Sequence, residues 1–462
     1  MPDSAAPRLD AVLDRLDAGR EAARERLFEL LRIPSISTDP AHAGECRRAA
    51  EWLSADLSGM GFEARVQETD GHPLVIAHRD GPGPHVLFYG HYDVQPVDPL
   101  ELWHRDPFDP AVVDQDGRPA IVGRGASDDK GQVMTFVEAC RAWLAEAGGL
   151  PCKVSVVLEG EEESTGDSLM RFLETRDELK ADIALVCDTT MWDADTPAIT
   201  TMLRGIVTEE VTIRAADRDL HSGFYGGAAA NPLHVLSRAM AGLHDAQGRV
   251  TLAGFYDGVP EISPEIRAQW EGLGFDDRAF LGAVGLSVPA GEAGRSALEH
   301  TWSRPTAEVN GLWGGYTGAG FKTVIPAEAH AKVSFRLVGE QDPEAVRAAF
   351  RAHVEACLPA DCTATFTGHG AARPIVMATD DPAFARAREA LSKEWGREAA
   401  FIGCGGSIPV VGDFRRTLGC DTALIGFALE DDRIHSPNEK YDLRSFEKGA
   451  RSWARILAAL AG

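Results

Sequence analysis

The sequence has no long hydrophobic run and no paired cysteine motif. No apolar stretch among its 462 residues approaches the roughly 20 residues that a membrane-spanning helix requires. The eight cysteines are scattered and form no CxxC pair, which is typical of reduced thiols in a cytoplasmic protein. The N-terminus has neither a basic segment nor an apolar core, so we expect no signal peptide and a cytoplasmic location.

Positive charge is also scarce. The 46 Lys and Arg residues are outnumbered by 71 Asp and Glu residues, which gives a formal net charge of −25. A surface this acidic repels phosphate backbones and anionic lipids, so we expect neither nucleic acid nor a membrane among the partners. Hydrophobic residues make up 44% and charged residues 25%, proportions that exclude disordered and fibrous proteins.

The first part of the chain alternates two patterns. Segments with apolar residues at helical spacing predict helices, and short continuous apolar runs predict strands that are buried on both faces. The predicted helices are 9–31, 46–60, 131–146 and 167–178, and the predicted strands are 85–90, 153–160 and 181–188. This alternation is typical of an α/β domain with a mainly parallel central sheet.

The pattern changes near residue 205. Strict apolar–polar alternation predicts a half-exposed sheet, and with two helical segments and a further strand it gives a β-α-β-β-α-β order. The segments are 207–215, 231–244, 330–338, 343–357 and 362–367, with 255–304 interpreted as a helical insertion. We therefore expect a ferredoxin-like α+β domain here.

The α/β pattern resumes after residue 372. A helix is predicted over 382–395, a strand over 422–429 and a last helix over 443–460. The order predicts a catalytic domain made of residues 1–205 and 373–462, with residues 206–372 inserted into it.

Five short segments carry histidine or acidic residues, and most of them directly follow a predicted strand. In an open α/β sheet ligands bind beyond the carboxyl ends of the strands, and imidazole with carboxylate is a ligand set for Zn²⁺ and similar ions. Each segment alone has an ordinary structural explanation, such as a helix N-cap or a solvated acidic loop. All five together favour a metal centre. Their residues are His91 and Asp93, Asp128 and Asp129, Glu161–Glu163, Asp188, and His435.

Taken in order, these segments resemble the motifs of the di-zinc metallopeptidases that include carnosinases, glutamate carboxypeptidases and aminoacylases. The resemblance spans nearly the whole chain and is closest to the carnosinase-like cytosolic dipeptidases. The further segments that carry it are RDLHSGFYGG (218–227), FKTVIP (321–326), FRLV (335–338), GGSIP (405–409) and HSPNEK (435–440). It implies metal-dependent hydrolysis of dipeptides that have a free C-terminal carboxylate, and it makes the inserted domain a lid and dimerisation domain.

The resemblance implies two divalent ions per subunit. Zn²⁺ is the expected metal, and Mn²⁺ or Co²⁺ fits the same ligands. Asp128 would bridge the two ions, and the Asp128–Asp129 peptide would be cis. His91 and Asp188 would complete one site, and Glu163 and His435 the other.

The resemblance also implies catalytic roles. Glu162 would be the general base that takes a proton from the attacking water. The run Glu161–Glu163 leaves its own register ambiguous, and the flanking residues place the base at Glu162 and the ligand at Glu163. Asp93 would accept a hydrogen bond from the second ring nitrogen of His91 and fix its orientation.

Further residues are implied in substrate binding. His221 would reach the active site of the partner subunit in a homodimer and stabilise the oxyanion there. Arg336 would bind the carboxylate of the small peptide substrate, and Thr323, Ser407 and His369 would assist.

Two alternatives remain open. An amidohydrolase that acts on N-acyl amino acids would need the same metals and the same carboxylate site, and would differ only in lacking a site for the substrate ammonium group. A catalytically dead binding protein is the other alternative. It would be expected to have lost a ligand or Glu162, and all of these are present.

Overall fold

The computed structural model describes residues 6–115, 117–164, 166–174, 176–406 and 408–462. Contacts divide them into two compact units. The first comprises the described residues of Met1–Thr201, Met377–Ile402 and Val410–Gly462, and the second those of Met202–Val376 and Gly403–Pro409. Among the described helices, none combines the length and the apolar character that crossing a bilayer demands.

A mixed sheet forms the centre of the first unit. Across the described residues its strand order is β1 (Glu63–Gln67), β2 (Leu74–Arg79), β6 (Cys152–Glu159), β3 (Gly83–His91), β7 (Ile183–Val186), β17 (Thr422–Leu424), β8 (Ala198–Leu203) and β15 (Ile375–Val376), with β16 (Ala400–Cys404) also beside β8. The pairs β6–β3, β3–β7 and β7–β17 are parallel, so the middle of the sheet is parallel as predicted. The outer pairs β1–β2, β2–β6 and β17–β8 are antiparallel.

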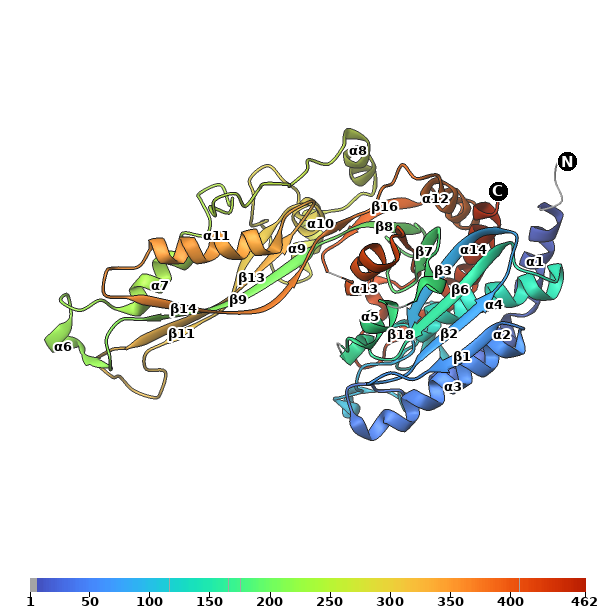
Figure 1. Ribbon diagram of the computed structural model, residues 1–462, viewed down its shortest axis with the longest axis horizontal. Coiled ribbons are helices and arrows are strands. Elements are labelled where there is room, and N and C mark those ends of the chain that lie inside the picture. The colour runs from blue at the N-terminus through green and yellow to red at the C-terminus, as the bar shows by residue number, and fades with distance from the viewer. Residues whose placement is uncertain (1–5, 116, 165, 175, 407) are drawn as a thin grey trace. The chain divides into compact units, whose positions relative to one another are not determined.

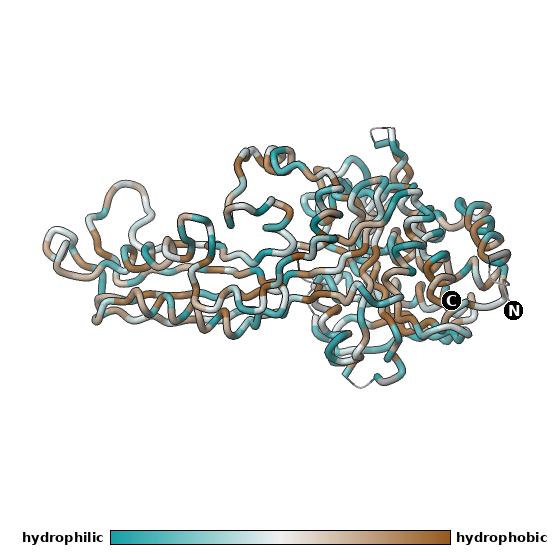
Figure 2. The backbone as a smooth tube through the Cα atoms, turned by 90° about the horizontal axis from the view of Figure 1, so that it is seen from above, coloured by the Kyte–Doolittle hydropathy of each residue, from teal (hydrophilic) through white to brown (hydrophobic). Residues whose placement is uncertain are grey.

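Helices pack against this sheet and against one another (Figure 1). The helices of the first unit are α1 (Ala6–Ala18), α2 (Arg20–Leu31), α3 (Ala43–Gly59), α4 (Lys130–Ala147), α5 (Ser168–Leu173), α12 (Pro382–Trp395), α13 (Pro409–Asp413) and α14 (Leu443–Leu460). Where α4 and α14 meet β3, Phe88 and Phe136 stack with ring centroids 3.8 Å apart, and Trp453 meets both edge-on. Figure 2 shows hydrophobic segments inside this unit and hydrophilic segments on its outside.

A small antiparallel sheet completes the first unit. Its strands are β4 (Ala111–Gln115), β5 (Arg118–Val122) and β18 (Lys440–Asp442), in the order β18-β5-β4. It connects the start of α4 with the segment that follows residue 435 in the chain.

Two predicted helices differ in extent from the structure. The segment 9–31 is divided at Gly19 into α1 and α2, and the segment 167–178 contains only the short helix α5 followed by a 3-10 turn. The C-terminal helix has the predicted bounds, 443–460.

The strand predicted over 422–429 was wrong in its second half, because β17 ends at Leu424. The amides of Phe427 and Ala428 donate instead to the side-chain oxygen of Gln132, at 2.7 and 3.2 Å. The buried side chain of Gln132 in α4 thus accepts the hydrogen bonds that a neighbouring strand would otherwise accept.

The second unit contains an antiparallel sheet with two helices on one face (Figure 1). Its strands, in spatial order, are β11 (Thr306–Gly314), β13 (Glu328–Leu337), β9 (Gly205–Arg214) and β14 (Thr363–Ala372), and its helices are α7 (Pro232–Ala241) and α11 (Pro343–Ala356). Along the chain these elements follow the order β-α-β-β-α-β. Val207 and Phe335 from the sheet pack with Leu236 and Phe350 from the helices, so the opposite face of the sheet remains polar.

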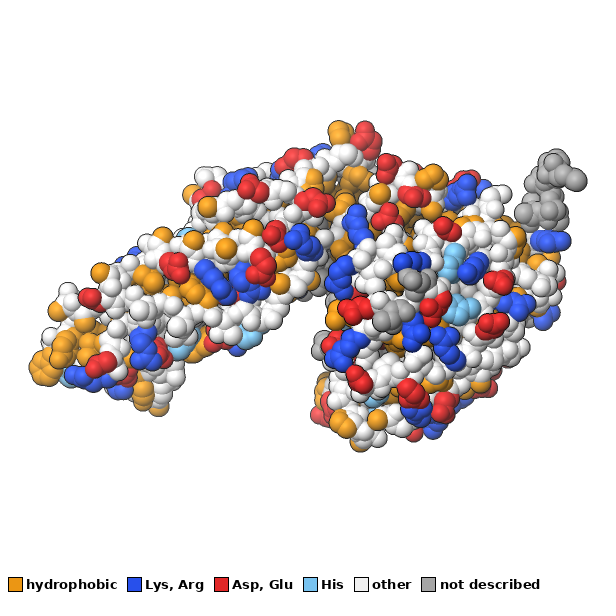
Figure 3. All heavy atoms as spheres, in the orientation of Figure 1, with side chains coloured by type: hydrophobic (Ala, Val, Ile, Leu, Met, Phe, Trp, Pro, Cys, Tyr) orange, Lys and Arg blue, Asp and Glu red, His pale blue; other side chains and the backbone are white. Residues whose placement is uncertain are grey.

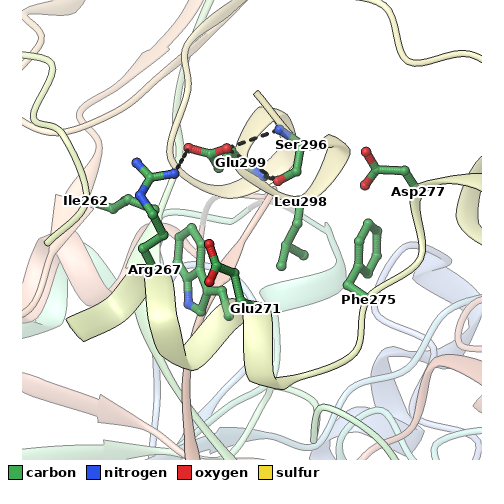
Figure 4. A pocket seen from close by; sticks show the side chains of 9 residues that line it. Ile262, Arg267, Glu271, Phe275, Asp277, Ser296, Leu298 and Glu299 are labelled. Carbon is green, nitrogen blue, oxygen red and sulfur yellow. Dashed lines mark hydrogen bonds and ion pairs between the residues drawn. The ribbon is translucent and has the colours of Figure 1, made fainter. Parts of the chain in front are cut away.

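Two smaller parts complete the second unit. One is a hairpin of β10 (Leu220–His221) and β12 (Val324–Ile325), with the one-turn helix α6 (Ser222–Tyr225) beside it. The other, within residues 255–304, contains α8 (Pro264–Gly272), α9 (Asp277–Gly282) and α10 (Ala297–Trp302). A cavity of about 180 Å³ lies between these helices, lined by the side chains drawn in Figure 4. There Glu299 accepts a hydrogen bond from Arg267 at 3.2 Å and also caps α10 at Ser296.

Candidate metal centre

Histidine and acidic side chains gather in the first unit at the carboxyl ends of its parallel strands. His91 is the last residue of β3, and Asp188 follows β7 by two residues. Glu162 and Glu163 lie in a 3-10 turn after β6. Because β6, β3 and β7 are neighbours that run in one direction, their ends meet at one edge of the sheet.

Asp128 and His435 join this cluster from loops. Asp128 precedes α4, and its peptide bond to Asp129 is cis, as the resemblance implies. His435 lies between β17 and β18 with a φ of 61°, in the left-handed region. Its side chain is half-exposed, whereas His91 is fully buried.

The six side chains form two groups of possible metal ligands. Within each group the ligand atoms lie within 4.8 Å of one another, and the groups are His91, Glu162 and Asp188, and Asp128, Glu163 and His435. Asp128 connects them, because its Oδ1 is 3.0 Å from His91 Nε2 and its Oδ2 is 2.9 Å from His435 Nε2. A carboxylate with one oxygen toward each group has the position of a bridging ligand. Glu162, which we expected as the base, lies in the group of His91.

Asp93 contacts both groups. The Nδ1 atom of His91 lies 3.1 Å from the main-chain oxygen of Asp93 and 3.4 Å from its carboxylate. The other carboxylate oxygen of Asp93 accepts a hydrogen bond from the amide of Glu163 at 3.0 Å. Asp93 therefore orients His91 mainly through its backbone, and its side chain also positions Glu163.

Glu439 is a positioning residue that the sequence analysis missed. Its buried carboxylate accepts from the amides of Gly125, Ser127 and Asp128, at 3.0, 2.9 and 3.0 Å, and pairs with buried Arg124 at 2.7 Å. Three amides on one carboxylate fix the loop that ends at Asp128. The signal was available in HSPNEK, whose acidic residue precedes a predicted helix without an assigned role.

The side chains of the Glu161–Glu163 run point in different directions. A Cβ atom added to Gly71 would lie 1.7 Å from the carboxylate of Glu161, and one added to Gly166 would lie 2.6 Å from it. Glu161 is thus packed between two glycines, and among the described residues it belongs to neither ligand group. The amide of Gln95 donates to Glu163 Oε2 at 2.7 Å.

The acidic groups of the cluster hold more negative charge than the two imidazoles balance. Burial raises the pKa of Glu162, and burial together with the charge of Asp128 raises the pKa of Asp188 well above its usual range. The carboxylates of Asp128 and Glu163 raise the pKa of His435 to about 10. In all three side chains the raised pKa favours the protonated form, which shows that the cluster lacks positive charge.

This donor set fits divalent cations. Imidazole nitrogens and carboxylate oxygens are the ligands that Zn²⁺, Mn²⁺ and Co²⁺ accept. Among the described residues, the buried Oε1 atom of Glu163, a member of the second ligand group, has no hydrogen-bond partner. A bound cation supplies the positive charge that such oxygens lack.

His221 and Thr323 lie together in the second unit. Ser222 follows His221 and donates its amide to the main-chain oxygen of Thr323 at 3.0 Å. His221 and Thr323 therefore lie close together at the hairpin of β10 and β12, beside α6. The ring of His221 is exposed and packs on Phe224, with centroids 4.6 Å apart.

Arg336 and His369 lie toward the other end of the same sheet. Arg336 is opposite Ile206 in β9 and projects from the polar face. His369 lies 3.5 Å from Glu210, at the bulge in β14. Ser407 lies outside the described residues.

Comparison with known proteins gives a consistent result. A family model described as "Peptidase family M20/M25/M40" matches residues 87–459. The chain is 28% identical to the Cys-Gly metallodipeptidase dug1 of Schizosaccharomyces pombe over 98% of each chain. It is also 28% identical to the human Beta-Ala-His dipeptidase, over 94% of this chain and 85% of that one. Among solved structures, the M20 family metallo-carboxypeptidase Sso-CP2 of Sulfolobus solfataricus has 29% identity and a TM-score of 0.79, over 95% of this chain and 99% of that one. The predicted resemblance to carnosinase-like dipeptidases is confirmed.

Proposed function

Because the chain belongs to the peptidase family M20/M25/M40, it is a metal-dependent hydrolase, and we propose that it cleaves dipeptides with a free C-terminal carboxylate. The observation that carries the proposal is the position of Asp128, whose two carboxylate oxygens each contact a histidine of a different ligand group. The dipeptidases that align over nearly the whole chain support this choice of substrate.

We propose that the two ligand groups hold two divalent ions and share Asp128 as a ligand. Zn²⁺ is the first choice of metal. Bound there, such ions polarise the scissile carbonyl and make the attacking water more acidic. Asp93 and Glu439 hold His91, Glu163 and Asp128 in the positions that the ligands need.

Glu162 is the proposed general base. It takes a proton from the water whose oxygen adds to the peptide carbonyl carbon. As the carbon–nitrogen bond breaks, Glu162 returns the proton to the leaving amine. Burial raises the pKa of Glu162, which makes its carboxylate a stronger base than an exposed one.

Arg336 is the proposed partner of the substrate carboxylate, since its guanidinium can bind both oxygens. His221 and Thr323 of the same chain cannot contact the substrate molecule that Arg336 binds. Strand β13 runs for roughly 26 Å between Glu328 and Arg336, and both residues lie beyond its Glu328 end. A dipeptide spans only about 7 Å.

We therefore propose that His221 and Thr323 serve the site of a partner subunit in a homodimer. Apolar side chains gather around α6 at this end of the second unit (Figure 3). Phe224 and Phe321 are 82% and 97% exposed in the single chain, which is typical of an interface. A cytoplasmic location also remains a proposal, supported by eight cysteines that are all free thiols.

The test is hydrolysis of a mixed L-dipeptide library by the metal-reconstituted protein, with N-acetyl amino acids in parallel. We expect free amino acids to be released from many dipeptides and the release to stop when a chelator is added. Activity confined to the acylated compounds would replace the dipeptidase proposal with a deacylase that uses the same centre.

A further inference from the structure

Arg204 ties three segments of the second unit together. Its amide donates to Gly406 O at 3.2 Å, and its Nε donates to Gly405 O at 3.0 Å. Its Nη1 donates to His300 O at 3.1 Å, in helix α10. One residue at the junction of β8 and β9 thus holds a glycine-rich loop and the last helix of the 255–304 segment.

This segment fits its place because Gly403 and Gly405 lack side chains. A Cβ atom at Gly405 would lie 3.1 Å from Arg204 Nη2 and 3.3 Å from the main-chain oxygen of Thr301. A Cβ atom at Gly403 would lie 2.6 Å from the side chain of Trp302. Helix α10 and Arg204 therefore form the two walls between which the loop is packed.

Arg204 lies beside Arg336, and the charge of Glu308 also acts on Arg204. Gly205 pairs with Leu337 in the sheet, which places these arginines near each other at one end of β9 and β13. All hydrogen bonds from Arg204 go to main-chain oxygens. Within the described residues neither guanidinium has a carboxylate within ion-pair distance. Burial, and then the charge of Arg336, lowers the pKa of Arg204 to about 10.

We propose that Arg204 is a positioning residue of the site for the substrate carboxylate. It fixes the Gly405–Gly406 backbone and places a second positive charge beside Arg336. Two neighbouring, half-buried cations are stabilised when a carboxylate binds near them. The 255–304 segment then has a role, because α10 supports Arg204 through His300. The inference rests on the proposed function, in which Arg336 binds that carboxylate.

The experiment compares Arg204→Gln with the wild-type holoenzyme on a dipeptide and on the same dipeptide with a C-terminal amide. We expect the KM for the free acid to rise about tenfold or more, as when a charged hydrogen-bond partner is removed, with kcat changed less than about threefold. The KM for the amide should not change. Arg373→Gln is the matched control, an exposed arginine of the same unit paired with Asp342, and it should resemble the wild type.

An equal rise in KM for acid and amide, or no rise for either, would overturn the proposal. If Arg204→Gln does not fold, Arg204→Met, which also removes the charge, provides the same comparison and is judged by the same two outcomes. The variant Arg336→Gln distinguishes failure of this inference from failure of the proposed function on which it rests. If Arg336→Gln removes the preference for the acid and the Arg204 variant retains it, only the role of Arg204 fails. If Arg336→Gln retains the preference, the carboxylate site itself is wrongly assigned.

Discussion

The carboxylate of Glu439 accepts a hydrogen bond at 3.0 Å from the main-chain amide of Asp128, the residue that joins the two ligand groups. The two residues are 311 positions apart in the chain. Glu439 therefore couples the C-terminal part of the first unit to the backbone of the proposed bridging ligand.

Replacement of Glu439 by Gln should weaken both metal binding and folding. Loss of a residue that orients a ligand lowers metal affinity by about 10- to 100-fold. Buried Arg124 would also lose its charged partner, which costs about 3–5 kcal/mol. Competition with a fluorescent chelator and urea unfolding measure the two effects. Exposed Glu51→Gln is the control, and wild-type metal affinity in Glu439→Gln would contradict the assigned role.

The neighbours Glu161 and Glu162 should respond very differently to removal of their charge. Glu162→Gln should lower kcat by about 10²- to 10⁴-fold, because it removes the proposed general base. Glu161→Gln should retain most activity, since that side chain is packed against Gly71 and Gly166. Steady-state kinetics with metal analysis of both variants checks this. A greater loss in Glu161→Gln would mean that the register is shifted by one residue.

Removal of metal should lower the thermal stability of the protein. Ions that bind only the folded state stabilise it by about 4 kcal/mol when their concentration is a thousandfold above Kd. We expect chelation to lower Tm by several degrees and Zn²⁺ to restore it. Asp128→Asn should abolish the response, because it removes the proposed shared ligand, which contacts a histidine of each group. A Tm that is the same with and without chelator would argue against a resident metal.

His78 and His85 should make stability depend on pH. Both rings contact the hydroxyl of Ser155, at 2.8 and 2.7 Å, and burial lowers the pKa of both. Protonation is then harder in the folded protein than in the unfolded chain, where imidazole titrates near pH 6.5. Above that pH both imidazoles are neutral in the folded and in the unfolded chain, so they do not affect the free energy of unfolding. As pH falls below about 6.5 toward the folded pKa values, the unfolded chain binds protons more readily, and the folded state loses stability.

The measurement is urea unfolding at pH 7.5 and 5.5. The double variant with His78→Gln and His85→Gln should lose less stability on acidification than the wild type. The control is His234→Gln, which changes an exposed histidine. Equal losses in the double variant and the wild type would show that other groups cause the pH dependence.

Complementation between subunits tests the proposed role of His221. His221→Ala and Glu162→Gln should each be nearly inactive alone. In a mixed dimer, one site would combine an intact Glu162 with an intact His221 from the partner, so random mixing should restore about a quarter of the wild-type activity. Mixing at several ratios and assaying a dipeptide measures this. No recovery in dimers shown to exchange subunits would place His221 in the site of its own chain.

The amino-acid sequence by itself determined the α/β pattern, the parallel strands at the centre of the sheet and the residues at their ends. Short continuous apolar runs are typical of strands buried on both faces, and an acid or histidine directly after such a strand lies at the edge of the sheet. His91, Asp188 and Glu163 could be recognised for this local reason. The C-terminal helix was predictable because its apolar spacing is regular over its whole length.

Tertiary structure alone decided which distant groups meet. The direction of Glu161 depends on Gly71, the end of β17 depends on the side chain of Gln132, and the loop before Asp128 depends on Glu439. Likewise, Thr323 lies with His221 and away from Arg336 because the hairpin extends beyond the far end of β13. Such contacts join residues that are far apart in the chain. They depend on packing and hydrogen bonding in the folded chain, and the local sequence pattern does not predict them.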